Sequence, residues 1–147
     1  MTTIAIAVDG TEASAAALAF AIGKARAERA QLNGIFVLDT GWADFIGNDW
    51  QSSRNARQGF LDYIRNQLEQ QSELARRQFA AATAGWANSR FACLPGDPAE
   101  ILTGLMQRGE ADAMVLGKAV FQACGRPSVK SLGKLLKRKV RQPVFVV

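Results

Sequence analysis

Residues 3–14 read TIAIAVDGTEAS, and this stretch contains a strand, a turn and the start of a helix. The apolar residues of 3–8 alternate with small alanines, so both faces are apolar, which is typical of a buried parallel strand. Asp9 and Gly10 then turn the chain, and Thr11 is a suitable N-cap for a helix. A buried strand that leads through a tight turn into a helix predicts an α/β fold.

The same strand-and-helix pattern recurs along the rest of the chain. Asn33-Gly34 is interpreted as the break between the first helix and the second strand. Right-handed crossovers between successive strands then predict one open, mostly parallel five-stranded sheet with helices on both faces. We expect strands at 3–8, 35–38, 90–94, 113–116 and 144–147, and helices at 13–30, 53–84, 98–106 and 132–140.

The strongest local pattern lies in GDPAE, residues 96–100. Asp97 is a preferred N-cap residue and Pro98 suits the first helical position. Glu100 stands where a capping-box partner is expected. The stretch therefore predicts the start of a helix at Pro98.

The composition limits the kinds of chemistry that the chain can perform. It has 147 residues, which suits a single domain over 1–147, and 48% of them are hydrophobic. It contains no histidine, which excludes Ser/His/Asp and Cys/His catalysis and imidazole metal sites. Cys93 and Cys124 match no metal or redox spacing and are expected to be reduced thiols. The N-terminus lacks a basic leader and no apolar run reaches membrane-spanning length, so we expect a cytoplasmic protein.

Positive charge is concentrated in the last quarter of the sequence. Eight of the 18 Lys and Arg lie within 113–147, which contains no Asp or Glu, although the whole chain has a net charge of +5. A one-sided basic segment can mark a surface that docks nucleic acid or an acidic protein. A solvated helix face with cations toward its C-terminus explains the same pattern. No RNA- or DNA-binding motif accompanies the basic segment.

The connection over residues 41–53 is unusually rich in aromatic residues. It contains Trp42, Phe45 and Trp50. We expect a flap that packs on the body of the protein; a lid or a subunit contact is the alternative.

Two turns are the natural candidates for a ligand site. In an open α/β sheet, ligands bind beyond the carboxyl ends of the strands, where the strand order reverses. Asp9-Gly10 follows the first expected strand and Gly117-Lys118 follows the fourth. The aspartate can accept a hydrogen bond from a ribose or adenine group, and glycine admits close backbone approach. Equally, Asp9 could cap the first helix and Gly117 could serve only as a turn.

The sequence resembles the universal stress protein family over nearly its whole length. The resemblance rests on IAIAVDGTEAS, FVLD, GDPAEIL, ADAMVLGK and the final PVFVV. It implies an adenine-nucleotide α-hydrolase-like fold with strand order 3-2-1-4-5. Within such a fold, it implies that Asp9 and the backbone of Val37 meet the adenosine half of a nucleotide.

Members of the family that bind ATP carry the pattern G-x2-G-x9-G-[ST] after the fourth strand. Here the first glycine is Gly117 and the final hydroxyl belongs to Ser131. Val120 and Lys130 occupy the second and third glycine positions. Val120 puts a branched side chain where backbone would approach phosphate. Lys130 either fills the phosphate space or contributes charge to it.

The resemblance implies a non-catalytic stress-response protein with a site for ATP, AMP or another anion. The site residues are then Asp9, Val37, Gly117, Lys118, Lys130 and Ser131, with no metal beyond the magnesium that a nucleotide carries. The alternative is an ATP-binding switch in which Lys130 replaces the motif glycine. A third hypothesis, from another class, is the basic docking surface described above.

The last expected strand, Val144–Val147, suggests assembly. The implied strand order places VFVV at an edge of the sheet. Two identical apolar edges can pair about a two-fold axis, and the resemblance implies a homodimer of this kind. A short edge protected by Pro143 is the alternative.

Overall fold

A computed structural model of the chain describes residues 2–38, 54–118 and 132–147. It contains a five-stranded sheet in the order β3-β2-β1-β4-β5, in which every neighbouring pair is parallel. This confirms the predicted fold class. The strands are β1 (Thr3–Ala7), β2 (Gln31–Leu38), β3 (Ser89–Pro95), β4 (Ala113–Leu116) and β5 (Val144–Val146). The helices are α1 (Glu12–Glu28), α3 (Arg54–Ala82), α4 (Pro98–Gln107) and α5 (Leu132–Lys139).

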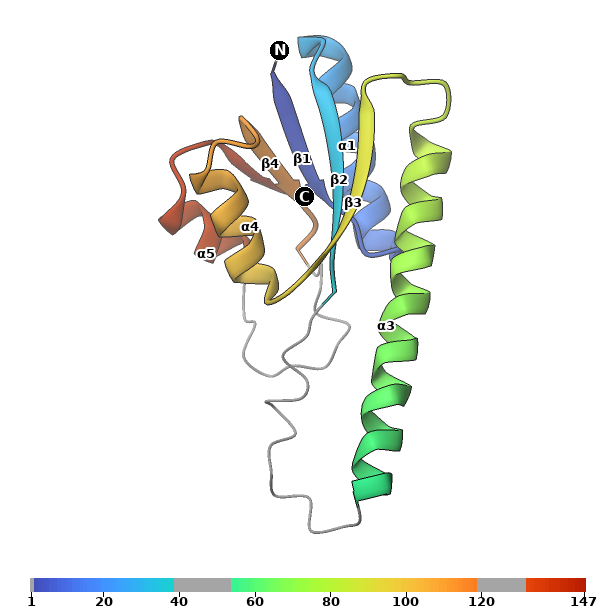
Figure 1. The fold of residues 1–147 in the computed structure, drawn as a ribbon. Coiled ribbons are helices and arrows are strands. Elements are labelled where there is room, and N and C mark those ends of the chain that lie inside the picture. Colours follow the sequence, from blue (N-terminus) through green and yellow to red (C-terminus); the bar gives the residue numbers. More distant parts are fainter. Residues whose placement is uncertain (1, 39–53, 119–131) are drawn as a thin grey trace.

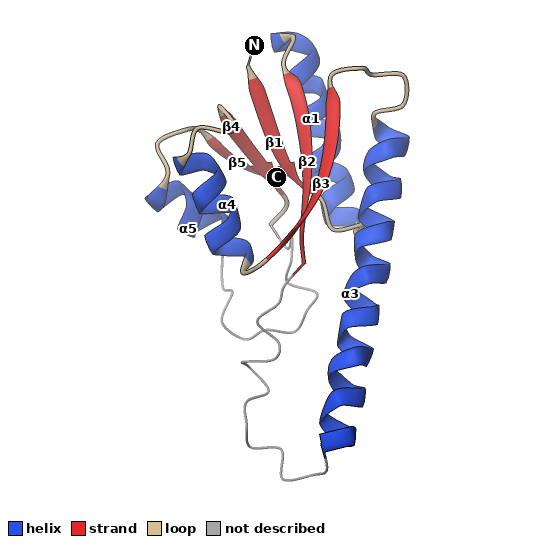
Figure 2. Cartoon of the chain, viewed as in Figure 1, coloured by secondary structure: helices blue, strands red, loops and turns tan. Residues whose placement is uncertain are grey.

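The helices form two layers around the sheet. Helices α1 and α3 cover one face, and α4 and α5 lie on the other (Figures 1 and 2). Strand β1 is in the middle of the sheet, and its residues from Ile4 to Ala7 are completely buried. Helix α1 packs closely on the sheet through the buried alanines Ala17, Ala21 and Ala25. Small side chains on both elements thus let helix and sheet approach each other.

Both predicted N-caps are confirmed. Thr11 caps α1, and its side chain accepts from the backbone N–H of Ser14. Asp97 caps α4, and its Oδ2 accepts from the backbone N–H of Glu100 at 3.1 Å. Pro98 occupies the first turn of α4, where its missing N–H leaves no hydrogen bond unmade.

The interpretation of Asn33-Gly34 as a break between elements is wrong. Strand β2 begins at Gln31 and runs through both residues. A Cβ on Gly34 would lie 2.6 Å from the ring of Phe79, so the glycine admits the aromatic ring of α3 to the sheet. Glycine within a strand marks either a bend or a close neighbour, and here the neighbour comes from another part of the chain.

Helix α3 is the longest element, and its amino-terminal half extends beyond the sheet (Figure 1). Its carboxyl-terminal half packs through the buried residues Ala75 and Phe79. No helix in the described part of the chain is long and apolar enough to cross a membrane. The aromatic connection at 41–53 lies outside the described residues, so its role as a flap or subunit contact stays a prediction.

Candidate functional site

The carboxyl ends of β1 and β4 meet where the strand order reverses. The chain passes from β1 to β2 on one side, and from β3 it crosses back to β4 on the other side of β1. The β1–β2 register pairs Ala7 with Ile35, and the β1–β4 register pairs Ile6 with Val115. Such a point is the usual ligand-binding position of an open α/β sheet.

Continuing these registers by a few residues brings the candidates together. Asp9 then stands level with Val37 on β2 and with Lys118 after β4. Val37 is buried, whereas Lys118 is exposed. The Lys118 backbone N–H donates to the Val147 carbonyl at 3.1 Å, which continues the β4–β5 ladder beyond β4. Four of the six predicted site residues, including Gly117, therefore lie near the carboxyl ends of neighbouring strands.

Asp9 is buried and holds the turn in which it lies. Its Oδ1 accepts from the Thr11 backbone N–H at 3.0 Å and from the Thr11 hydroxyl at 2.6 Å. Its own backbone N–H donates to Ser14 Oγ at 3.0 Å. Asp9 thus supports Thr11, and Thr11 in turn caps α1. The carboxylate is consequently fixed in position, with only 1% of its residue exposed.

Helix α3 holds the same turn from the other side. The Gln71 side-chain amide donates to the Asp9 carbonyl at 3.3 Å, and that of Gln78 donates to the Thr11 carbonyl at 2.9 Å. These glutamines are two helical turns apart, so they lie on one face of α3. Gly10, between the two carbonyls, has φ +82° and lies against Leu74 of α3. Contacts from α3, which is distant in the sequence, therefore help to hold the conformation of this turn.

Gly117 has a packing function of its own. A Cβ at this position would lie 2.9 Å from the carbonyl oxygen of Ala13 in the first turn of α1. Glycine thus lets the amino-terminal end of α1 approach the end of β4. A close contact thus occurs at Gly117 with this protein's own backbone, and the expected approach of a ligand there stays a prediction.

The remaining motif residues, Val120, Lys130 and Ser131, lie outside the described residues. Sequence analysis missed Ser14, Gln71 and Gln78 as parts of this region. Ser14 could have been found from its position in the first turn of the expected helix, where a hydroxyl can reach the preceding turn. No sequence pattern could have identified the two glutamines, because they reach the turn only through tertiary packing.

The family model described as the universal stress protein family matches residues 1–147. The chain belongs to this family. No curated protein matched the sequence. Among solved structures, the chain is similar to the universal stress protein UspA from Lactobacillus plantarum, with a TM-score of 0.72 and 23% identity over 99% of this chain and 97% of that one.

Two other similar structures contain nucleotides. One is a universal stress protein in complex with cAMP, with a TM-score of 0.62 and 21% identity over 99% of this chain and 96% of the other. The second is the universal stress protein from Archaeoglobus fulgidus in complex with dAMP, with a TM-score of 0.61 and 16% identity over 99% and 97% of the two chains. At these identities the similarity establishes the shared fold.

The described parts of this universal stress protein contain no group of three or more His, Cys, Asp or Glu side chains that could hold a metal ion. Cys93, on β3, is a free thiol that is half-buried. Its sulfur accepts from the Ser72 hydroxyl on α3 at 3.4 Å. Cys93 thus joins β3 to α3, away from the turns after β1 and β4.

Proposed function

We propose that this protein is a non-catalytic, cytoplasmic stress-response protein that binds an adenine nucleotide or another anion. The ligand lies beyond the carboxyl ends of β1 and β4. The observation that carries this proposal is the register, which sets Asp9 level with Val37 and Lys118 at the reversal of strand order. The structures that contain cAMP and dAMP have the same fold, which supports an adenine nucleotide.

Each candidate residue has a separate role in this proposal. Asp9 and the backbone of Val37 contact the adenosine half, because a fixed carboxylate can accept from ribose or adenine donors. Gly117, Lys118 and Ser131 contact the phosphate end, where Lys130 takes up space that a motif glycine would leave open. The bonds from Thr11 hold the Asp9 carboxylate before a ligand arrives, which reduces the entropy lost on binding. The absence of histidine from the chain favours binding over acid–base catalysis.

Isothermal titration with ATP, AMP and inorganic phosphate tests the ligand. We expect weak or no ATP binding, with AMP or phosphate bound at least as well, because Val120 and Lys130 replace motif glycines. Lys130→Gly should then raise the ATP affinity about tenfold, which corresponds to 1.4 kcal/mol. Lys130→Gln is the matched control, since it removes the charge and keeps most of the side-chain volume.

The outcomes separate this proposal from the ATP-switch alternative. Tight, magnesium-dependent ATP binding by the unmodified protein would contradict weak binding. An ATP affinity that falls in both Lys130 variants would show that the lysine charge holds phosphate. Failure of all three ligands to bind would rule out the nucleotide or anion site.

We also propose that two copies of the chain associate through β5. This strand is at an edge of the sheet, and its bonds to β4 use Pro143 O and Val147 N. The alternation of a strand turns the backbone groups of Val144 and Val146 away from β4, where a second copy can pair with them. Phe20 of α1, 43% exposed, extends the apolar surface beside the edge.

Phe20→Glu should weaken the dimer at least tenfold, because Phe20 packs on Phe145 of β5 with ring centroids 5.7 Å apart. Sedimentation velocity over a concentration series measures the change, starting from a 15.9 kDa chain. Tyr63→Glu is the control, since Tyr63 is an exposed aromatic residue on α3, far from β5. A monomeric parent protein, or equal effects of both variants, would contradict association through β5.

A further inference from the structure

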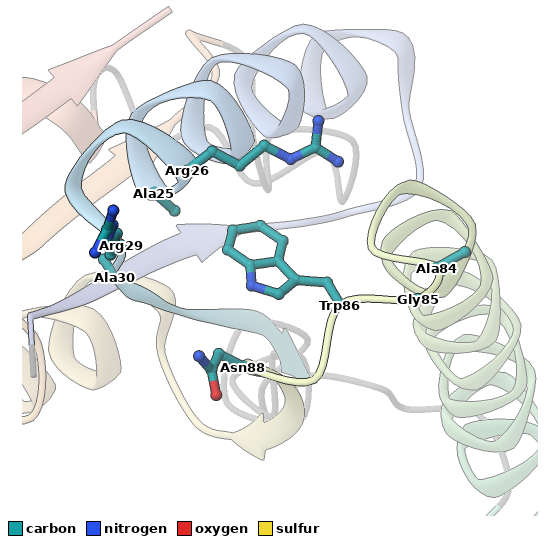
Figure 3. A pocket seen from close by; sticks show the side chains of 8 residues that line it. All are labelled: Ala25, Arg26, Arg29, Ala30, Ala84, Gly85, Trp86 and Asn88. Atoms are coloured by element: carbon teal, nitrogen blue, oxygen red, sulfur yellow. The ribbon is translucent and has the colours of Figure 1, made fainter.

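A pocket of about 520 Å³ lies at the amino ends of the strands, opposite the proposed nucleotide site. Figure 3 shows it between the end of α1 and the turn that leads from α3 into β3. All of its lining residues belong to the described part of the chain. They are Ala25, Arg26, Arg29, Ala30, Ala84, Gly85, Trp86 and Asn88.

The charged groups of this pocket are all cationic. Arg26 and Arg29 line it together with Trp86 and Asn88, and no Asp or Glu does. Among the described residues, neither guanidinium forms an ion pair with an acid. Glu28, their neighbour in α1, is paired with Lys24 at 3.3 Å. The pocket therefore combines two guanidinium groups whose charge no acid neutralises there.

The indole of Trp86 lines the pocket beside Arg26. It crosses the middle of Figure 3, with Arg26 extending alongside it. The Arg26 guanidinium carbon is 6.0 Å from the ring centroid, within the range of a cation–π contact. The Trp86 backbone carbonyl accepts from the Ser89 hydroxyl at 2.8 Å, and the Trp86 backbone N–H donates to the Thr83 carbonyl at 3.0 Å. A flat apolar surface thus stands beside the cations.

Arg29 is in a backbone conformation that arginine rarely adopts. It ends α1 with φ 53° and ψ 41°, and it is the only described non-glycine residue with positive φ. Glycine is the usual residue at such a helix end. A cation in the last helical turn, such as Arg26, interacts favourably with the helix dipole without this strain. The last carbonyls of α1 accept from backbone N–H groups of Arg29 and Ala30, so the Arg29 side chain is not needed to cap them.

We propose that this pocket binds the oxyanion of a small molecule that carries a flat ring, either a phosphate ester or a carboxylate. The Arg26 guanidinium, which lies beside the indole, donates to the oxyanion, since its planar donor set matches both carboxylate and phosphate. Arg29 adds positive charge at the other end of the pocket. The ring lies against the indole of Trp86. A pocket of this volume is of the size that small ligands occupy.

NMR titration of the Trp86 indole N–H resonance tests the proposal. Trp86→Phe assigns this resonance among those of the three tryptophans. The probes are phenyl phosphate, benzoate and inorganic phosphate. We expect a saturable shift with phenyl phosphate or benzoate and a weaker response to inorganic phosphate, which has no ring. The tighter of the two ring probes identifies phosphate ester or carboxylate as the ligand group.

The double variant Arg26→Gln/Arg29→Gln should lower the probe affinity about tenfold or more, because it removes charged donors from the anion. Arg76→Gln is the matched control. Arg76 also lies over an aromatic ring, 5.2 Å from the centroid of Phe91, but it is paired with Glu73 at 3.8 Å. The absence of a saturable shift with every probe would overturn the proposal. An equal loss in the control variant, or an undiminished affinity in the double variant, would do the same.

Arg29→Gly separates binding from folding. Glycine relieves the left-handed conformation, so the midpoint of thermal unfolding should rise while the probe affinity falls as it does in Arg29→Gln. Unchanged affinity in Arg29→Gly would show that the Arg29 side chain takes no part in binding. Because the readout is local to Trp86, the result does not depend on whether a nucleotide binds beyond β1 and β4.

Discussion

Phe79→Ala should lower the free energy of unfolding by about 3–5 kcal/mol, the usual loss for a large buried aromatic side chain. Phe79 is 3% exposed, and its ring packs on Gly34 of β2 and on Phe91 of β3, with the two phenylalanine centroids 5.7 Å apart. Removing it leaves a cavity between α3 and the sheet. Urea unfolding followed by circular dichroism measures the change. Tyr63→Ala, at an exposed position of the same helix, should lower the free energy of unfolding far less.

A second substitution at Gly34 tests whether this contact is the cause. Gly34→Val alone should destabilise the protein by about 1–3 kcal/mol, because its Cβ meets the Phe79 ring. In the Phe79→Ala background the same valine enters the cavity, and the branched side chain suits a strand. The double variant should therefore lose about 0.5–3 kcal/mol less free energy of unfolding than the sum of the two single losses. Simple additivity of the two effects would show that Gly34 and Phe79 do not share this space.

Gly117→Ala should destabilise the protein by about 1–3 kcal/mol, because the added methyl group overlaps backbone. The overlapping atom is the Ala13 carbonyl oxygen, 2.9 Å from the new Cβ, which no rotamer change can move away. The first turn of α1 must shift instead. Any such shift also moves the Asp9 turn, whose hydrogen bonds depend on Ser14 and Thr11.

The same glycine-to-alanine substitution within α1 should have the opposite effect on stability. Gly23 is exposed, and a Cβ there would meet nothing within 4 Å. Gly23→Ala should therefore stabilise the protein by about 0.5–1 kcal/mol, since alanine is the better helix former. Chemical unfolding of both variants gives the comparison. If Gly117→Ala left the free energy of unfolding unchanged, α1 would not pack closely against the end of β4.

The sequence predicted the candidate site in part. The position of Asp9 and Gly117 after the first and fourth strands followed from the order of elements and from the resemblance to the family. The hydrogen bonds from Gln71 and Gln78 could not be predicted, because they join α3 to a turn far away in the chain. The pocket around Trp86 was missed for the same reason. Its arginines and its indole come from α1 and from the turn before β3.

The succession of strands and helices and the caps at Thr11 and Asp97 could be predicted without the fold. These features depend on apolar periodicity and on hydrogen bonds between residues close in the chain. The tertiary structure alone decided that Gly34 is inside a strand and which group each crowded glycine faces. In the sequence, a glycine that forms a turn cannot be told from a glycine that admits a close contact. Only the neighbour that packs against it, brought there by the fold, distinguishes the two.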